Sequence, residues 1–263
     1  MKNRFFWLIF VFVLIPCLSS TSTAEKVRMV TNLGNIDIVL FDDIAPITVA
    51  NFLNYINNGD YVDTLIHRSI PGFVIQGGGW TINGSSIYPV EKNPPIVNEF
   101  SHSNLRGTIA MAKLPDDPNS ATCEWFFNLA DNSANLDFQN GGFTAFGQLT
   151  EQSLAVMDAI ASLNVYDASE ALNSSAFTNL PLLNNELRPE YLVVVSRMIV
   201  AGDLPAGDID DNWVVDLADA VMGLGIITGI PGEGPNPASE INGDGSIGVE
   251  EVIYILQKVS ELR

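Results

Sequence analysis

The sequence predicts a mainly β protein, an antiparallel barrel or sandwich with two helices, followed by a small all-α unit. Short segments that alternate apolar and polar residues recur along the first 200 residues, and turn residues separate them. Only two segments there have helical periodicity, and they do not alternate regularly with the strands, so a parallel sheet is not expected. After Val200 the composition changes to glycine, proline and then clustered acids, which indicates a second unit.

The first 24 residues have the pattern of a secretory signal peptide. Lys2 and Arg4 form a basic head, residues 5–14 are apolar, and small residues lead up to Ala24. The apolar run is too short to predict a stable membrane span. We therefore expect an exported protein, periplasmic or extracellular, whose mature chain begins near residue 25.

An alternative leader would carry a lipid on Cys17. Pro16 stands where such a leader needs a small residue, which disfavours this alternative. If the leader is removed after Ala24, Cys123 is the only cysteine left, and no internal disulfide can form. Stability would then depend on the hydrophobic core and on bound ions, although export permits disulfides.

The formal net charge of −19 restricts the possible partners. Removal of the leader would take away two basic residues and leave the mature chain more acidic still. Negative charge repels nucleic-acid phosphates and anionic lipid surfaces, so we expect no nucleic-acid partner and no binding to anionic membrane surfaces, in addition to no stable membrane span. A solvated acidic surface accounts for much of this charge, but not for the regular spacing of acids near the C-terminus.

The expected N-terminal elements are a hairpin and a helix. Residues 26–31 and 35–41 alternate in polarity and flank a turn that contains Gly34. In the helix that follows, Pro46 suits the first turn, and apolar residues from Val49 to Ile56 repeat with helical spacing. Gly59 is placed to end this helix.

Strands and a second helix are expected in the rest of the first 200 residues. The strands lie at residues 108–112, 124–129, 143–149 and 191–200, and the helix at about residues 152–163. Residues 80–104 contain several prolines and predict loops. Residues 164–189 predict a long polar connection.

The most informative stretch is HRSIPGFVIQGGG, at residues 67–79. A Pro-Gly turn separates two extended runs, and side chains alternate faces within each run, with Phe73 on one face and Gln76 on the other. Even so, Arg68, Phe73 and Gln76 could converge on one shallow surface, and the glycines permit a close approach to the backbone. A cation, an aromatic ring and an amide suit a neutral ligand with an apolar ring beside a carbonyl, as in an X-Pro bond.

This stretch and three further blocks resemble the cyclophilin family of peptidyl-prolyl cis-trans isomerases. The blocks are GTIAMA at residues 107–112, SATCEWFFN at 120–128 and FTAFGQL at 143–149. The likeness extends from about Val27 to Val200, so we assign residues 25–201 to this domain. It implies an eight-stranded antiparallel barrel capped by two helices.

The resemblance also implies the site residues. Arg68, Phe73 and Gln76 are the expected catalytic residues. The expected substrate-binding residues are Val74, Ala112, Glu124, Phe126, Leu136 and Phe143. Considered singly, an apolar residue of this set could be ordinary core, and Arg68 could form a surface ion pair. Family members usually carry glutamine where Glu124 stands, so Glu124 would either orient the Arg68 guanidinium or partly neutralise it.

Isomerisation of an X-Pro bond needs no nucleophile, proton transfer or cofactor. The amide has a torsional barrier of about 18–20 kcal/mol because its nitrogen is conjugated with the carbonyl. Catalysis needs a pocket for the proline ring and a donor to the twisted amide, and each tenfold acceleration takes about 1.4 kcal/mol of preferential binding to that state. We expect an isomerase that acts on proline-containing polypeptides and assists the folding of exported proteins.

Two other functions, a hydrolase and a non-catalytic binding module, are alternatives to the isomerase. A hydrolase is disfavoured because the chain has no HExxH motif, no serine-centred elbow and no Cys-His pairing, and because His67 is expected to face away from Arg68. A non-catalytic module that binds proline peptides, docked to a partner by the C-terminal unit, would use the same pocket. The sequence does not separate this module from the enzyme.

The C-terminal residues contain two segments with the spacing of calcium-binding loops. They lie within residues 208–263, after an expected linker at residues 202–207. The ligands expected from the first loop are Asp208, Asp210, Asn212, Val214 through its carbonyl, Asp216 and Asp219. Those from the second loop are Glu240, Asn242, Asp244, Ser246 through its carbonyl, and Glu251.

Each loop leads into an apolar helical pattern without a helix before it, which resembles a dockerin module more than a complete EF-hand pair. The resemblance implies bound calcium and a cohesin-like protein partner. Trp213 stands where glycine normally permits the turn of the first loop. The alternatives are a disordered acidic tail, which would need no apolar helices, and an appendage that only stabilises the protein. Repulsion among the carboxylates predicts that metal binding folds this unit.

Overall fold

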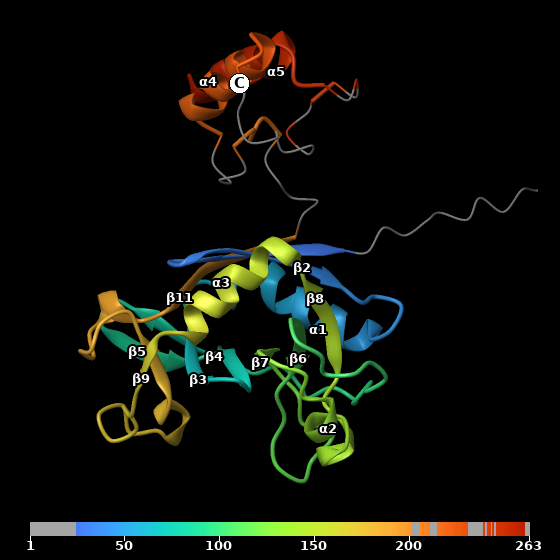
Figure 1. The fold of residues 1–263 in the computed structure, drawn as a ribbon, viewed down its shortest axis with the longest axis vertical. Helices are drawn as coiled ribbons and strands as arrows, with labels where there is room; N and C mark the ends of the chain where they lie inside the picture. The colour runs from blue at the N-terminus through green and yellow to red at the C-terminus, as the bar shows by residue number, and fades with distance from the viewer. Residues whose placement is uncertain are drawn as a thin grey trace, which may run out of the picture.

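The computed structural model describes residues 25–200, 206–210, 215–230, 239, 241, 242, 244 and 246–260 (Figure 1). The predicted signal peptide, most of the predicted linker, and the expected ligands Asn212, Val214 and Glu240 lie outside the described residues, as does Trp213. Within those ranges, no helix combines the length and the apolar character that a membrane crossing requires.

Eight antiparallel strands form a closed barrel. They follow the order β3-β11-β1-β2-β8-β6-β7-β4, and β4 pairs back onto β3. The nine strands of this sheet are β1 (Lys26–Thr31), β2 (Gly34–Leu40), β3 (Thr64–Ile70), β4 (Val74–Asn83), β5 (Ser86–Pro89), β6 (Thr108–Met111), β7 (Trp125–Asn128), β8 (Ala145–Leu149) and β11 (Val194–Val200). β5 only extends β4 as a hairpin. The predicted eight-stranded barrel is confirmed.

Two helices pack against the barrel (Figure 1). Helix α1 (Pro46–Asn57) begins at its proline and buries Phe52 and Tyr55. Helix α3 (Glu151–Ala161) packs along β2 and buries Met157 and Ile160. The shorter helical elements are α2 (Ser133–Leu136), η1 (Gln139–Gly141), η2 (Ser175–Phe177) and η3 (Pro189–Tyr191).

Aromatic side chains fill much of the barrel core. The strands alternate, so Ile36, Ile38 and Leu40 of β2 all point inward and are buried. They join the fully buried aromatic residues Phe52, Tyr55, Tyr61, Trp125, Phe127 and Phe146. Burial of each large apolar side chain contributes about 1.5–3 kcal/mol relative to its exposure, which makes this core the main stabilising feature of the barrel.

Two regions predicted as loops contain strands. β4 continues through Asn83, and Gly84, with φ of +62°, allows the tight turn to β5. In residues 164–189, β9 (Asn164–Tyr166) pairs with β10 (Leu180–Leu182). These predictions were wrong because β5 has only four residues and β9 and β10 have only three each. The β9–β10 pair is also held by packing against β3, through a buried cluster that includes Phe177. Local periodicity does not reveal such packing, because it depends on residues distant in the chain.

The glycine triplet of β4 makes room for the protein's own side chains. A Cβ on Gly78, which has φ of +82°, would lie 2.6 Å from the carbonyl oxygen of Cys123 and 2.6 Å from Trp125 Nε1. A Cβ on Gly79 would lie 2.7 Å from the Glu124 carboxyl carbon. The close approach that these glycines predicted is therefore made by the segment that enters β7.

The Gly78→Ala substitution is expected to lower the free energy of unfolding by about 2–5 kcal/mol, because strain from a positive φ adds to overpacking. Gly84→Ala is the matched control, since Gly84 also has a positive φ but no atom lies within 4 Å of its Cβ position. This control should lose only about 1–2 kcal/mol in urea unfolding. Equal losses in the two variants would show that the contact at Gly78 is relieved without cost.

The C-terminal helices form an internal repeat. Helix α4 (Leu217–Ile227) and helix α5 (Val249–Val259) have the same length, and both bounds of α5 are displaced from those of α4 by 32 residues. They pack around a small core of Ile209, Ala220, Val252 and Ile255. Gly223 permits this packing, because a Cβ there would lie 2.8 Å from Val252 Cγ2.

Candidate functional site

The strand register places three of the candidate site residues in one row that crosses four strands. Arg68 on β3 is opposite Gln76 on β4, Gln76 is opposite Phe126 on β7, and Phe126 is opposite Ala110 on β6. Side chains at directly paired positions lie on the same face of a sheet, with Cβ atoms about 4.5–5.5 Å apart. The barrel therefore collects on one face residues that are distant in the sequence.

A pocket of about 240 Å³ lies on this face. Its lining residues are Arg68, Phe73, Val74, Gln76, Ala112, Lys113, Phe126, Leu136, Gln139 and Phe143. Eight of the nine site residues expected in the barrel are among them. The ninth, Glu124, lines an adjacent pocket of about 260 Å³ that also includes Gln76, Ala112 and Lys113.

The pocket has an apolar floor and an aromatic wall. Val74 and Leu136 are buried beneath it, and the rings of Phe126 and Phe143 meet edge to face with centroids 5.8 Å apart. Phe73 precedes β4 and lies in the turn, so strand alternation does not govern its side chain, and it lines the same pocket as Val74 and Gln76. The expectation that Phe73 and Gln76 occupy opposite faces was wrong for this reason.

Polar side chains form a chain of contacts beside the apolar pocket. Arg68 Nη1 donates to Gln76 Oε1 at 3.0 Å, and Gln76 Nε2 donates to Glu124 Oε2 at 2.7 Å. Nε2 of the buried His67 lies 3.6 Å from the same Glu124 oxygen. His67 thus reaches the network from beside Arg68, where β3 has a register shift. Alternation alone did not predict this contact.

The charges in this network stabilise one another. Burial raises the pKa of Glu124, but hydrogen bonding and charge from His67, a hydrogen bond from Gln76 and the charge of Lys92 outweigh it, so the pKa is lowered. The carboxylate therefore stays ionised at neutral pH. Burial lowers the pKa of the Arg68 guanidinium, and the negative charge of Glu124 opposes this effect. Arginine remains charged under such conditions.

Lys113 and Gln139 line the pocket but were not predicted. Lys113 Nζ donates to the carbonyl oxygens of Asn140 and Gly142 at 2.7 and 2.6 Å, and lies 4.7 Å from the Phe143 ring centroid. Burial lowers its pKa to about 8, although the charge of Asp117 opposes the shift. Lys113 holds the loop that leads to Phe143, one of the two residues of the aromatic wall. Its position directly after Ala112 was the only sequence signal for this role.

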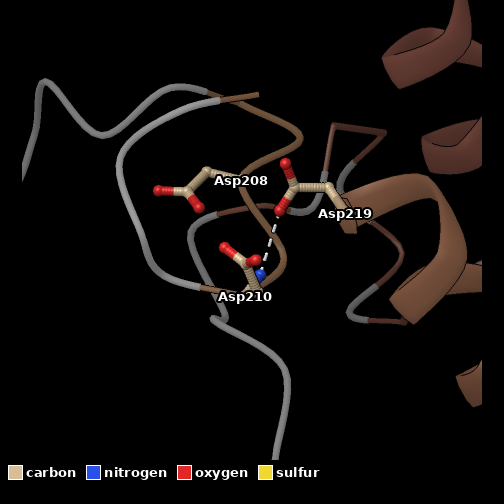
Figure 2. A group of neighbouring side chains, drawn as sticks. All are labelled: Asp208, Asp210 and Asp219. Carbon is tan, nitrogen blue, oxygen red and sulfur yellow. Dashed lines mark hydrogen bonds between the residues drawn. The ribbon is translucent and has the colours of Figure 1, made fainter. Parts of the chain in front are cut away.

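A second group of polar residues comprises two residues of the segment before α4 and one residue in the first turn of α4. Figure 2 shows the side chains of Asp208, Asp210 and Asp219 grouped together. Their carboxylate oxygens come within 4.8 Å of one another, and Asp208 and Asp219 are fully buried. Asp219 Oδ1 accepts hydrogen bonds from the backbone N–H groups of Ile209 and Asp210, and Oδ2 accepts one from that of Asp216. Oxygen atoms in this arrangement could hold a hard cation such as calcium.

The loop before α5 repeats this hydrogen-bond pattern. Glu251 Oε1 accepts from the N–H of Ile241 at 3.3 Å, and Oε2 accepts from that of Gly248 at 2.6 Å. Ile241, Gly248 and Glu251 follow Ile209, Asp216 and Asp219 by 32 residues each. Three expected ligands also contact each other, because Asp244 bonds Asn242 and accepts from the N–H of Ser246. Both loops are thus built around the carboxylate at their last position.

A closed barrel with a guanidinium and an amide beside an apolar pocket is suited to a polypeptide segment that carries an apolar ring. Comparisons with known proteins agree. The family model described as cyclophilin type peptidyl-prolyl cis-trans isomerase/CLD matches residues 26–179. The chain belongs to this family, and its enzyme class is peptidyl-prolyl cis-trans isomerase.

Three curated bacterial proteins illustrate the similarity. Peptidyl-prolyl cis-trans isomerase A of Dickeya dadantii is 38% identical over 170 residues, which cover 63% of this chain and 83% of that protein. The peptidyl-prolyl cis-trans isomerase of Acinetobacter baylyi is 42% identical, with 52% and 72% covered. Peptidyl-prolyl cis-trans isomerase B of Escherichia coli is 40% identical, with 49% and 80% covered.

Proposed function

We propose that this protein isomerises X-Pro bonds in exported polypeptides, with Arg68 as the residue that acts on the amide. The observation that carries the proposal is the placement of a half-buried guanidinium beside an apolar pocket bounded by Phe126 and Phe143. In this arrangement the proline ring enters the pocket and its amide lies against Arg68. Phe73, Val74, Ala112 and Leu136 complete the apolar contact with the ring.

Catalysis follows from what Arg68 can donate. A guanidinium has five N–H donors, and the hydrogen bond to Gln76 uses one of them. The remaining donors can bond the prolyl carbonyl and the amide nitrogen as it becomes pyramidal during rotation. These bonds are stronger in the twisted state than in either planar isomer, so they lower the barrier. Gln76, with a second amide hydrogen, can bond the substrate backbone.

The isomerase and the non-catalytic binding module differ in one observable. The isomerase accelerates cis–trans exchange in a short Ala-Pro peptide, whereas a binding module holds the peptide without accelerating its exchange. Exchange rates and peptide binding should therefore be measured on the same protein by NMR. Acceleration supports the isomerase, and binding without acceleration supports the module.

Export is the proposed setting of this activity, and the pattern of residues 1–24 supports it. The substrates would then be proline-containing segments of proteins that fold outside the cytoplasm. N-terminal sequencing of the protein recovered from the periplasm or the medium tests this proposal. A mature chain beginning near Glu25 supports export, and an intact leader on protein found only in the cytoplasm contradicts it.

The C-terminal unit is proposed to bind calcium. The clustered carboxylates of Asp208, Asp210 and Asp219 and the repeated hydrogen-bond pattern of the two loops support this proposal. In the first loop, Asp208, Asp210, Asp216 and Asp219 would provide side-chain oxygens. In the second loop, Asn242, Asp244 and Glu251 would do so, and Ser246 would add its carbonyl. Calcium prefers such sets of oxygen ligands.

The two C-terminal helices are also proposed to dock a cohesin-like partner. Leu217, Val221 and Leu224 of α4 are exposed. Their counterparts 32 residues later are Val249, Ile253 and Leu256, which are exposed as well. Exposed apolar stripes on a charged unit are typical of interaction surfaces.

Titration of a purified cohesin domain into the full chain, with calcium and with chelator, tests this docking. Binding only with calcium is expected, and Val221→Asp together with Ile253→Asp should abolish it. Calcium binding without any cohesin binding would favour the stabilising appendage instead.

A further inference from the structure

We infer that Glu124 is a positioning residue, which orients the side-chain amide of Gln76 and, through Gln76, the guanidinium of Arg68. This inference rests on the proposed role of Arg68 in catalysis. It concerns position 124, where this chain has a carboxylate. Glu124 and Arg68 both lie in the described part of the chain, and no ion pair joins them directly there, so the hydrogen-bonded connection between them passes through Gln76.

The argument begins with the hydrogen-bonding capacity of the three groups. An ionised carboxylate only accepts hydrogen bonds, and a guanidinium only donates them. The amide of Gln76 lies between the two and has one end of each kind. Only one orientation satisfies both neighbours, with Nε2 toward Glu124 and Oε1 toward Arg68. The acid therefore removes the freedom of the amide to flip.

Glu124 is itself held on several sides. Gly79 has no side chain, so the Glu124 carboxyl can lie close to the backbone of β4. The Glu124 carbonyl oxygen accepts from the N–H of Ala112 at 2.9 Å, which fixes its backbone at the edge of the pocket. His67 Nε2 lies 3.6 Å from Oε2 on the buried side. The carboxylate can therefore act as a fixed acceptor.

A glutamine at position 124 would not impose this order. Its amide can donate or accept, so Gln76 could bond it in either orientation. In the flipped orientation the Gln76 NH₂ group would face the Arg68 guanidinium, and neither would have an acceptor. Arg68 would then spend part of its time away from the position in which it meets the substrate amide.

A double-mutant cycle tests this coupling. Glu124→Gln is expected to lower kcat about fivefold with KM nearly unchanged. The loss of one ordinary hydrogen bond has an effect of about this size. In a Gln76→Leu background, which removes the connecting amide, the same substitution should change kcat less than about 1.5-fold. Glu151→Gln, which neutralises an exposed acid on α3, is the matched control and should change nothing. Equal effects of Glu124→Gln in both backgrounds would overturn the inference.

A spectroscopic measurement keeps this test separate from the proposed role of Arg68. The ¹⁵N signals of the Arg68 side chain should show slow rotation of the guanidinium in the wild type and faster rotation in Glu124→Gln. If these signals do not change, Glu124 does not position Arg68, whatever the activity. If they change while Arg68→Ala retains full activity, Glu124 positions Arg68 but the proposed catalytic role fails. Thermal unfolding of each variant identifies any loss of fold.

Discussion

Replacing Arg68 with alanine is expected to lower kcat/KM for an Ala-Pro peptide by about 100-fold, because the loss of one preorganised donor to a transition state typically costs a factor of about 10²–10³. The apolar pocket stays in place, so peptide binding should weaken much less than catalysis. Line-shape or exchange NMR on the peptide gives both quantities. Arg68→Lys should recover only part of the activity, because a point charge does not replace a planar fork of donors.

Arg188→Ala is the matched control for this experiment. Arg188 is exposed, forms ion pairs with Glu186 and Glu190, and does not line the pocket. Exposed ion pairs contribute little to stability, about 0–1 kcal/mol, so this variant should fold and keep full activity. An Arg68→Ala protein that is folded and as active as Arg188→Ala would remove Arg68 from the mechanism.

Removing calcium is expected to destabilise the C-terminal unit while the barrel remains folded. Calcium at about 1,000 times its dissociation constant would stabilise the unit by about 4 kcal/mol, a large effect for so small a core. Without metal, the carboxylates of Asp208, Asp210 and Asp219 repel one another. NMR spectra and thermal unfolding with calcium and with chelator give the measurement. Loss of chemical-shift dispersion should be confined to the NMR signals of residues in α4 and α5.

Two variants identify the ligands in this experiment. Asp208→Asn keeps an oxygen at a buried position and removes its charge, so calcium affinity should fall about tenfold or more. Glu250→Gln removes one negative charge from an exposed position of the same unit, outside the expected ligand set, and should leave the affinity nearly unchanged. Equal losses in the two variants would mean that general attraction to an acidic surface, and not a defined site, holds the cation.

The sequence by itself determined the strands whose residues alternate, the two helices of the barrel and most of the pocket. β1 and α1 carry regular local patterns, so their positions could be predicted closely. Short strands such as β5 and β9 could not be predicted in this way, because they depend on a neighbouring strand and not on their own composition. The residues of the apolar pocket were predicted through their motifs, which are contiguous in the chain.

The tertiary structure alone decided how the polar residues connect. Cross-strand pairing places Gln76 between Arg68 and the distant Glu124, and no local pattern encodes a contact between residues 48 positions apart. The register shift in β3 lets His67 reach the same carboxylate, and the fold of the η1 loop places Lys113 against the carbonyls behind Phe143. Such contacts depend on the register and closure of the barrel, which the whole chain sets together. Motifs therefore predicted most of the residues that form the pocket, and barrel closure decided which of them act on one another.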